Sequence, residues 1–465
     1  MTHRALLLAA TTGYQTRAFG KAAGRLGVEL VFATDRCDQI DDPWQDGAVA
    51  IRFHEEDRSV ALIVDAARDR PIDAILAVGD RPTVIAAAAA RALSLPWHPA
   101  EAATIARHKL LTRERLRDAG LRVPWFQPVA IRPSRLGEPS AVSHIAVQGL
   151  TYPCVIKPVT LSGSRGVMRA DDPASFLVAF ERLRRLLAAP DIRAERAAAH
   201  DLALVEGFVP GREYAVEAIM HHGKFHLLAM FDKPDPLDGP FFEETIYVTP
   251  SSASDADQRL IVDAIARAAS AIGLRHGPIH AECRVNASPD QQVFVLEVAA
   301  RPIGGHCARA LRFDRVPTPE SKRPSVVPQL PDPESRIAFE ELLLRHALGE
   351  APQMWRRERE ASGVMMIPIP RRGTFRSVEG LDAARAVAHV IDVAITAKPD
   401  QLLVPLPEGA SYLGFIFARA ESPTEVERAL RTAHACLRFR IDTEFRVLSG
   451  SQVHYNQGNG TDGLL

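Results

Sequence analysis

The sequence predicts an α/β unit followed by α+β units, in a chain of 465 residues that is long enough for about three domains. In the first 100 residues, short apolar runs alternate with amphipathic stretches, which indicates a parallel sheet with helices on both faces. Four strand-like runs between residues 202 and 248 predict a small antiparallel sheet. From about residue 363, short strands and two helices predict a closing α+β domain.

The first unit is expected to have the alternating order of a doubly wound fold. Its first strand-to-helix turn, residues 11–16, carries one glycine and lacks the GxGxxG pattern, which disfavours an NAD-dependent oxidoreductase. The pattern therefore predicts a Rossmann-like unit without a dinucleotide. We expect strands at residues 5–9, 29–33 and 74–78, and helices at residues 17–27, 59–70 and 81–92.

The later elements are read from the same periodicities. Helix 109–119 marks the passage to the next unit, and helix 175–188 follows a glycine-bearing loop. Residues 313–336 contain six prolines and are expected to cross between units in an extended form. We also expect a helix at 255–272 with Ser254 as its N-cap, a hairpin formed by 277–285 and 292–299, and a helix at 337–348.

Composition disfavours several classes of partner and of structural site. Lysine plus arginine (56) nearly cancels aspartate plus glutamate (57), so the global charge does not favour nucleic acid or an anionic membrane. The five cysteines are widely spaced without a CxxC pair, which disfavours a disulfide framework and a structural zinc site. A reducing cytoplasm fits this cysteine usage, and the absence of any long apolar run predicts no membrane span.

A phosphate-binding element is the strongest chemical signal. An apolar strand at 154–156 ends in Lys157, and a polar turn follows whose backbone N–H groups can face an anion. A solvated hairpin turn is the alternative reading. Lys109, at the start of a helix, would on its own be a surface charge. The turn consists of Ser162, Gly163, Ser164, Arg165 and Gly166.

Residues 204–217 end one strand and begin another. The backbone of Glu206, Phe208 and Val209 can hydrogen-bond an adenine edge, while Glu213 can accept ribose hydroxyls. The alternative is a hairpin with an exposed pair of glutamates.

Two carboxylates fall on the two strands of the second hairpin. Glu282 and Glu297 supply the hard oxygen ligands that magnesium prefers, whereas an exposed strand face is the alternative. His280 shares the face of Glu282 by strand alternation, either lining a pocket or packed in the core.

A cation and a glycine pair follow the second glutamate. Arg301 with Gly304, Gly305 and His306 can hold a carboxylate or a developing oxyanion; a plain turn with a surface arginine is the rival reading. Residues 231–244 look too polar and proline-rich for a strand, so we expect a loop over the site with Lys233 contacting a phosphate or an intermediate.

Together these motifs resemble the ATP-grasp superfamily, and within it carboxylate-amine ligases similar to L-amino acid ligases. The resemblance covers nearly the whole chain. It is carried by residues 78–81, 108–109, 119–120, 152–167, 205–217, 277–282 and 296–305, and by residues 363–370 through 412–418.

The resemblance implies an ATP-grasp fold with a Rossmann-like pre-ATP-grasp domain at 1–100. The ATP-grasp domain would span 101–350, with a lid subdomain at about 145–210. A C-terminal α+β domain would occupy 351–450, and 451–465 would form a flexible tail.

The resemblance also implies roles for the site residues. Lys109, Lys157 and the turn would contact ATP phosphates, Glu213 the ribose, and Glu282 and Glu297 would hold Mg²⁺ or Mn²⁺. Arg301 would stabilise the reacting centre as a carboxylate, activated as an acyl phosphate, couples to an amine. Many superfamily members have an asparagine two residues after the second metal glutamate, where this chain has Ala299. The implied partners are small-molecule carboxylates and amines, and the resemblance is compatible with a homodimer.

Two other functions stay open at this point. One is a biotin-carboxylase-like enzyme that activates bicarbonate, although no biotin-carrier segment is recognisable. The other is a catalytically silent ATP-binding module, for which Ala299 is the motive.

Overall fold

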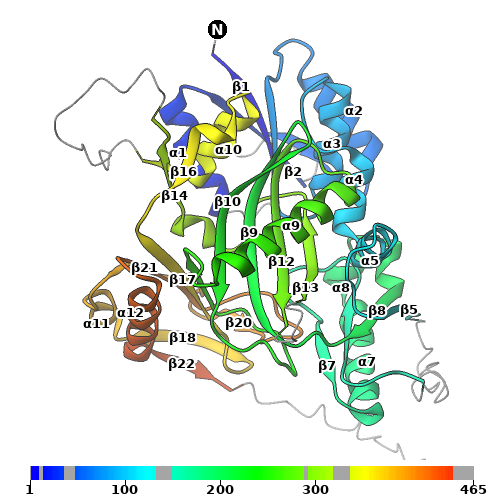
Figure 1. Ribbon diagram of the computed structural model, residues 1–465, viewed down its shortest axis with the longest axis vertical. Coiled ribbons are helices and arrows are strands. Elements are labelled where there is room, and N and C mark those ends of the chain that lie inside the picture. Colours follow the sequence, from blue (N-terminus) through cyan, green and yellow to red (C-terminus); the bar gives the residue numbers. More distant parts are fainter. Residues whose placement is uncertain are drawn as a thin grey trace, which may run out of the picture.

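The computed structural model describes residues 2–9, 14–35, 48–131, 149–286, 292–317 and 336–443. Figure 1 shows the N-terminal unit in blue at the top, the lid unit in teal at the lower right and the C-terminal unit in orange at the lower left, all around a green central sheet. Parts of the first turn, of the hairpin connection and of the proline-rich crossing, and the whole of the predicted tail 451–465, lie outside the described residues.

The N-terminal unit contains the predicted parallel sheet. Its strand order is β3-β2-β1-β4, and every residue from Ala5 to Ala9 in β1 is buried. Helices cover it because their apolar stripes pack on this buried strand. The elements are β1 (Arg4–Ala9), α1 (Tyr14–Leu26), β2 (Glu29–Asp35), β3 (Val49–Ile51), α2 (Glu56–Ala66), β4 (Ala74–Val78) and α3 (Thr83–Ala92).

A four-stranded sheet forms the lid unit, in the order β5-β8-β6-β7. Its helix α7 (Pro173–Leu187) begins with a capping box between Asp172 and Ser175 and buries Phe176, Phe180 and Leu183 against the sheet. The other elements of the lid unit are β5 (Phe126–Ala130), β6 (Cys154–Pro158), β7 (Met168–Ala170), α8 (Pro190–Arg193) and β8 (Leu202–Gly207). Helices α4 (Ala100–Arg107) and α5 (Lys109–Asp118) precede this unit and pack against strand β13 (Val293–Ala299) and helix α9 (Asp255–Ile272) of the central part of the molecule.

The central sheet has eight strands in the order β13-β12-β9-β10-β11-β17-β21-β19. The predicted small antiparallel sheet is therefore wrong: three of its strands lie within this larger sheet, and the fourth, β8, belongs to the lid unit. The larger sheet forms because β11 pairs with a strand more than a hundred residues later, which leaves no local signal. Its strands are β9 (Arg212–His221), β10 (Lys224–Lys233), β11 (Ile246–Thr249), β12 (Gly277–Val285), β13 (Val293–Ala299), β17 (Ala361–Ile367), β19 (Val390–Ile395) and β21 (Gly414–Ala420).

Helices cover this sheet. Helix α9 (Asp255–Ile272) has the predicted Ser254 cap and ends at Gly273, whose φ of 92° favours glycine. Helix α10 (Phe339–Ala347) packs near the N-terminal unit (Figure 1). The remaining elements are β14 (Arg312–Arg315), β15 (Ile337–Ala338), β16 (Trp355–Arg357), β18 (Gly373–Glu379), α11 (Leu381–Arg385), β20 (Leu402–Leu403), α12 (Pro423–Cys436) and β22 (Arg438–Asp442).

The lid unit is fastened to the C-terminal unit through a latch made of Gly166, Arg165, Arg182, Pro407 and Glu408. The amide of Gly166 donates to Pro407 O at 2.8 Å, and Arg165 Nε donates to Glu408 O at 2.8 Å. Arg182 adds a bond from Nη2 to Glu408 Oε2 at 2.9 Å. The polar turn after β6 is therefore held by residues that follow it by about 240 positions.

Among the helices of the described segments, none combines the length and apolar character needed to cross a bilayer.

Candidate active site

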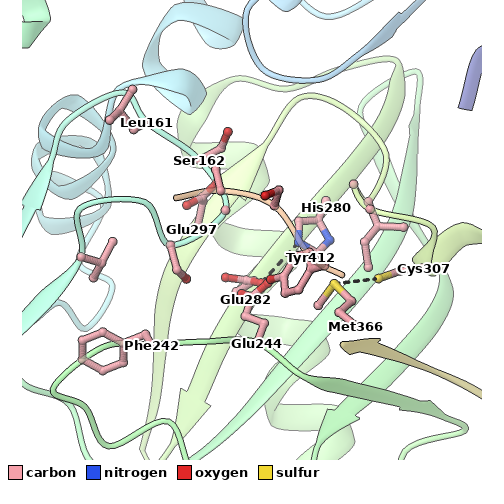
Figure 2. Close-up of a pocket in the computed structure, with 18 of the residues that line it drawn as sticks. Leu161, Ser162, Phe242, Glu244, His280, Glu282, Glu297, Cys307, Met366 and Tyr412 are labelled. Carbon is pink, nitrogen blue, oxygen red and sulfur yellow. Dashed lines mark hydrogen bonds and ion pairs between the residues drawn. The ribbon is translucent and has the colours of Figure 1, made fainter. Parts of the chain in front are cut away.

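A cavity of about 1390 Å³ lies where the three units meet over the central sheet. Its floor is formed by β9, β12 and β13, and its walls by the polar turn of the lid, the end of β4 and residues 396–412. Figure 2 shows Glu244, Glu282 and His280 together, with Glu297 and Ser162 nearby. The predicted residues that line it are Lys109, Lys157, Ser162, Gly163, Ser164, Glu206, Phe208, Val209, Glu213, His280, Glu282, Glu297, Arg301, Gly304 and Gly305.

Lys157 projects from β6 into a buried ion cluster. Its Nζ lies 2.5 Å from Glu206 Oε1, and Arg113 Nε donates to Glu206 Oε2 at 2.8 Å. Burial lowers the pKa of Lys157 to about 8, despite the neighbouring carboxylate. The two cations keep the pKa of Glu206 low, at about 2, against the effect of burial. One carboxylate is thus shared by two cations, which leaves positive charge for an anionic ligand.

Lys109 reaches the same region from the start of α5. Its Nζ donates to Leu161 O at 2.7 Å and lies 3.4 Å from Glu297 Oε2. The polar turn then passes over the cavity with Gly163 at φ 62° and Ser164 at φ 53°. Gly166 does not line the cavity: a Cβ there would contact Leu183 and Leu186 of α7. Its amide serves the latch instead.

An aromatic wall lies beside the strand connection after β8. The ring of Phe208 stacks on Phe242 with centroids 6.4 Å apart, and Arg169 lies 4.3 Å from the Phe208 centroid. Val209 O accepts a hydrogen bond from Arg284 Nη1 at 2.7 Å. A flat, apolar ring fits such a wall, because it stacks without requiring charged partners.

The predicted carboxylate pair is assembled. Glu282 of β12 and Glu297 of β13 are direct cross-strand partners in an antiparallel ladder with a bulge after Glu282. Both line the cavity. The hairpin prediction and the cross-strand arrangement are therefore confirmed by the register, while metal binding stays a prediction.

Lys233 does not line the cavity but lies beneath it. Its Nζ donates to Glu213 Oε1 at 2.8 Å, Glu244 Oε1 at 2.8 Å and Glu282 Oε1 at 2.6 Å. Burial opposes the charged form, but the three carboxylates raise the pKa of Lys233 well above its usual value. An ammonium has three N–H donors, so this arrangement leaves none for a phosphate.

The expected loop from residue 231 is wrong in its first part. Residues 231–233 are the end of β10, paired with β9, and the loop begins only afterwards. The polar residues are tolerated in the strand because Lys233 is neutralised by Glu213, its cross-strand partner. Phe242 and Glu244 of the later loop do line the cavity, as expected of a covering segment.

His280 is buried and charged. Its Nδ1 lies 2.5 Å from Glu217 Oε1, and its Nε2 lies 3.5 Å from Glu282 Oε1. Burial alone would lower its pKa, but the Glu217 carboxylate raises the pKa of His280 to about 9. His280 is also the cross-strand partner of Ala299. Ala299, which stands where many superfamily members have an asparagine, therefore lies opposite the imidazole of His280.

Arg301 is held by Asp80, which follows β4 in the N-terminal unit. The guanidinium donates from Nε to Asp80 Oδ1 at 2.8 Å and from Nη2 to Oδ2 at 3.0 Å. Burial opposes ionisation of Asp80, but Arg301 lowers its pKa to about 2. Such a bidentate pair fixes the plane of the guanidinium. His306 lies outside the cavity lining, with its ring edge against Phe415.

Several lining or supporting residues were missed by the sequence reading. Arg284 shares the face of His280 and Glu282 by strand alternation, so the same period-two argument would have found it. Asp80 lies within residues 78–81, which carry part of the family resemblance, but no role was predicted for it. Arg113 and Tyr412 offered no local signal, because only tertiary structure brings them to the site.

The donor set fits magnesium. Glu282 and Glu297 present carboxylate oxygens on one face, and Lys233, Tyr247 and His280 all approach the same oxygen of Glu282, Oε1. The acidic group Glu213, Glu244 and Glu282 keeps ligand oxygens within 4.8 Å of one another, and the Lys233 ammonium is the cation that these carboxylates share in this structure. These residues therefore suit a hard cation better than a thiophilic one.

Comparison with known proteins agrees with this geometry. The sequence matches the ATP-grasp N-terminal domain over residues 20–97, the ATP-grasp domain over 150–310 and the L-amino acid ligase C-terminal domain 2 over 365–442. The structure of an L-amino acid ligase from Bacillus licheniformis is 25% identical, with a TM-score of 0.74 over 95% of this chain and 100% of that one.

Two curated relatives are more partial. An uncharacterised protein of Sinorhizobium fredii is 24% identical over 74% of this chain, and the match spans 63% of that protein's length. Alanine–anticapsin ligase of Bacillus subtilis is 27% identical over 34% of this chain and 35% of its own length. The predicted resemblance is confirmed: the chain contains an ATP-grasp domain, flanked by an ATP-grasp N-terminal domain and an L-amino acid ligase C-terminal domain 2.

Proposed function

We propose that this protein is an ATP-dependent ligase that activates a carboxylate as an acyl phosphate and couples it to an amine. The observation that carries the proposal is the cavity that joins Lys109, Lys157 and the polar turn to the Glu282–Glu297 pair and to Arg301. Cations for phosphate oxygens, carboxylates for a metal and an anchored guanidinium are the parts that phosphoryl transfer to a carboxylate requires.

ATP would bind between the lid and the central sheet. Its adenine would stack near Phe208 and Phe242, with the backbone of residues 206–209 at the ring edge and Glu213 near the ribose. Lys157 and Lys109 would offset the charge of the phosphates. The N–H groups of Ser162, Gly163 and Ser164 would close over them.

Glu282 and Glu297 would hold Mg²⁺, which neutralises phosphate charge when bound. His280 lies directly across the strand pair from Ala299. Its hydrogen bond to Glu217 holds the ring in place beside Glu282. Because both carboxylates of the Glu282–Glu297 pair are present and line the cavity together with Lys109 and Lys157, the arrangement supports an active enzyme over the silent nucleotide-binding module.

Arg301 would bind the carboxylate substrate. A carboxylate oxygen attacks the γ-phosphorus, the bond to the bridging oxygen breaks, and ADP leaves. The amine nitrogen then attacks the acyl carbon, phosphate departs, and the amine loses a proton. Because Asp80 fixes Arg301, the guanidinium can stabilise the oxyanion without reorganising.

The carboxyl and amine substrates are proposed to be amino acids or similar small molecules. The C-terminal residues 396–412 line the cavity and fall within the part matched by the L-amino acid ligase C-terminal domain 2. The names of the relatives, an L-amino acid ligase and an alanine–anticapsin ligase, point to the same substrate class. These observations favour an amine acceptor over the bicarbonate activation of a biotin-carboxylase-like enzyme.

The test is a screen of ADP release with ATP, Mg²⁺ and pairs of amino acids or other carboxylates and amines. We expect ADP release that depends on both members of a pair, with the amide product detected by mass spectrometry. Glu297→Ala should lower the rate on the order of a hundredfold or more. ATP binding without ADP release across the panel would contradict the proposal, as would release that requires biotin and bicarbonate.

A further inference from the structure

A second cluster of titratable side chains lies at the other end of β9. His221 ends β9, His276 lies in the connection between α9 and β12, and His346 is in the last turn of α10. One ring nitrogen of each lies within 4.8 Å of those of the other two. In Figure 1 this is the upper end of the central sheet, where α10 lies.

The three rings are in direct contact. His221 Nδ1 and His346 Nε2 are 3.1 Å apart, and the rings of His276 and His346 stack with centroids 4.4 Å apart. His276 and His346 are buried, and His221 is half-buried. Nδ1 of His276 is buried without a hydrogen-bond partner in the described part of the chain. A buried nitrogen of this kind calls for a ligand, because unpaired polar atoms are rare in protein interiors.

The rings are neutral at physiological pH. Burial, together with the neighbouring imidazoles, lowers the pKa of His276 to about 4 and that of His346 to about 2. Burial also lowers the pKa of His221. The contact between His221 Nδ1 and His346 Nε2 places a proton on one of these two nitrogens, and a bound ion would move that proton to the other nitrogen of the ring.

The backbone around the cluster is already ordered. The amide of Gly223, in the turn after His221, donates to Arg275 O at 2.8 Å, next to His276. His98 of the N-terminal unit brackets the same segment, since its Nδ1 accepts from the amide of Arg275 at 3.1 Å and its Nε2 lies 3.1 Å from Pro278 O. The accepting Nδ1 requires Nε2 to be the donor. Two of the three ligand segments are therefore held together before any ion binds.

We propose that His221, His276 and His346 form a binding site for a divalent transition metal of the Zn²⁺ class. Zn²⁺ binds imidazole nitrogen at about 2.0–2.1 Å, and a tetrahedral site separates ligand nitrogens by about 3.4 Å. The 3.1 Å contact of His221 with His346 is near this spacing, so small ring rotations would complete the site. Three imidazoles leave a fourth position for water.

The site is separate from the proposed catalytic cavity. His221 is eight residues along β9 from Glu213, which corresponds to roughly 26 Å. The imidazole donor set also differs from the carboxylate set, which suits Mg²⁺. A bound ion would join the β9–β10 turn, the segment before β12 and α10. Whether this zinc site exists is independent of whether the ligase proposal is correct.

The experiment is a titration of metal-free protein with Zn²⁺ against a chromophoric chelator, in the presence of excess Mg²⁺. We expect one tightly bound equivalent per chain and a rise in melting temperature. Co²⁺ in place of Zn²⁺ should give the visible absorption of a nitrogen-ligated site. His276→Ala and His221→Asn should weaken Zn²⁺ binding by more than the roughly 10- to 100-fold seen when only an outer hydrogen-bond partner is removed.

Two control variants change side chains outside the proposed zinc site and test whether Zn²⁺ binding is specific to the three histidines. His434→Asn removes a histidine on the distant α12, and Glu282→Gln alters the acidic group; both should keep the equivalent of Zn²⁺. His221 is half-buried, so its variant carries the test if His276→Ala does not fold. Wild-type protein that binds no Zn²⁺ under these conditions, or folded His221→Asn protein that binds it as tightly as wild type, overturns the proposal.

Discussion

Two buried lysines support the cavity, and their pKa values are shifted in opposite directions. Lys157 shares the single carboxylate of Glu206 with Arg113, and its pKa is lowered to about 8 by burial. Lys233 donates to three carboxylates, and its pKa is raised well above its usual value. The Lys157 end therefore has two cations for one carboxylate. At the Lys233 end the three carboxylates face three cations, because Arg284 also pairs with Glu213 and His280 lies beside Glu282. The two ends thus differ in how fully their charges are paired, and the Lys157 end is the one with a cation to spare for phosphate oxygens.

The largest expected effect follows from removing the charge of Lys233. Lys233→Met leaves Glu213, Glu244 and Glu282 facing one another without their shared cation, and breaking a buried ion pair costs about 3–5 kcal/mol. We expect that loss in the free energy of unfolding, measured by urea denaturation, and partial recovery in Mg²⁺, because a divalent ion can replace the ammonium.

Arg431→Met serves as the matched control, since Arg431 forms exposed ion pairs with Asp235 and Glu427. Its effect should stay within about 1 kcal/mol. If Lys233→Met were as stable as this control and indifferent to Mg²⁺, the contacts of the Lys233 ammonium with its three carboxylates would make no net contribution to stability.

The next largest effect is expected at the Lys157 end of the cavity. Lys157→Ala should lower the rate of ADP formation on the order of a hundredfold or more, because one phosphate-facing cation is lost. The fold should persist, since Arg113 still neutralises Glu206. Steady-state kinetics and circular dichroism measure the two quantities. Near-normal turnover in the folded variant would remove Lys157 from the site.

A smaller effect should appear with pH. In the proposed site Lys157 would bind phosphate as an ammonium, and its pKa of about 8 means that it loses its proton as the pH rises through that value. Bound phosphates favour the protonated form, so affinity for a non-hydrolysable ATP analogue should fall by up to about tenfold per pH unit above pH 8. Calorimetry in two buffers should detect proton uptake on binding.

Lys157→Arg is the control for this dependence. A guanidinium stays charged throughout this range, so the decline above pH 8 should disappear in that variant. Equal affinity of the wild-type protein at pH 7 and pH 9 would show that the charge of Lys157 is not needed for nucleotide binding.

Local patterns were sufficient for much of the fold. Strand β4, helix α9 and strand β12 have the predicted bounds, because each is a periodic run closed by turn or capping residues. The pairing of Glu282 with Glu297 follows from two such strands joined as a hairpin. Such features depend on neighbours in sequence and can be read from a single chain.

Long-range features could not be predicted in this way. Asp80 and Arg301 are 221 positions apart, and the strand that completes the central sheet after β11 begins at Ala361. The polar, proline-rich composition of residues 231–244 predicts a loop at Lys233, whereas three distant or cross-strand carboxylates allow this lysine to be buried at the end of a strand. The partners that permit an unusual residue are invisible in its local sequence.

The latch joins the lid unit, through Gly166, Arg165 and Arg182, to Pro407 and Glu408. It therefore couples the lid unit to a segment of the C-terminal unit that also borders the cavity. The neighbouring residues Ala410, Ser411 and Tyr412 line the same cavity. Under the proposed function, opening the lid for nucleotide exchange would therefore pull on the wall beside the acceptor substrate. Substitutions in residues 404–412 made to change substrate preference should then also change how long ADP stays bound, so that selectivity and turnover have to be engineered together.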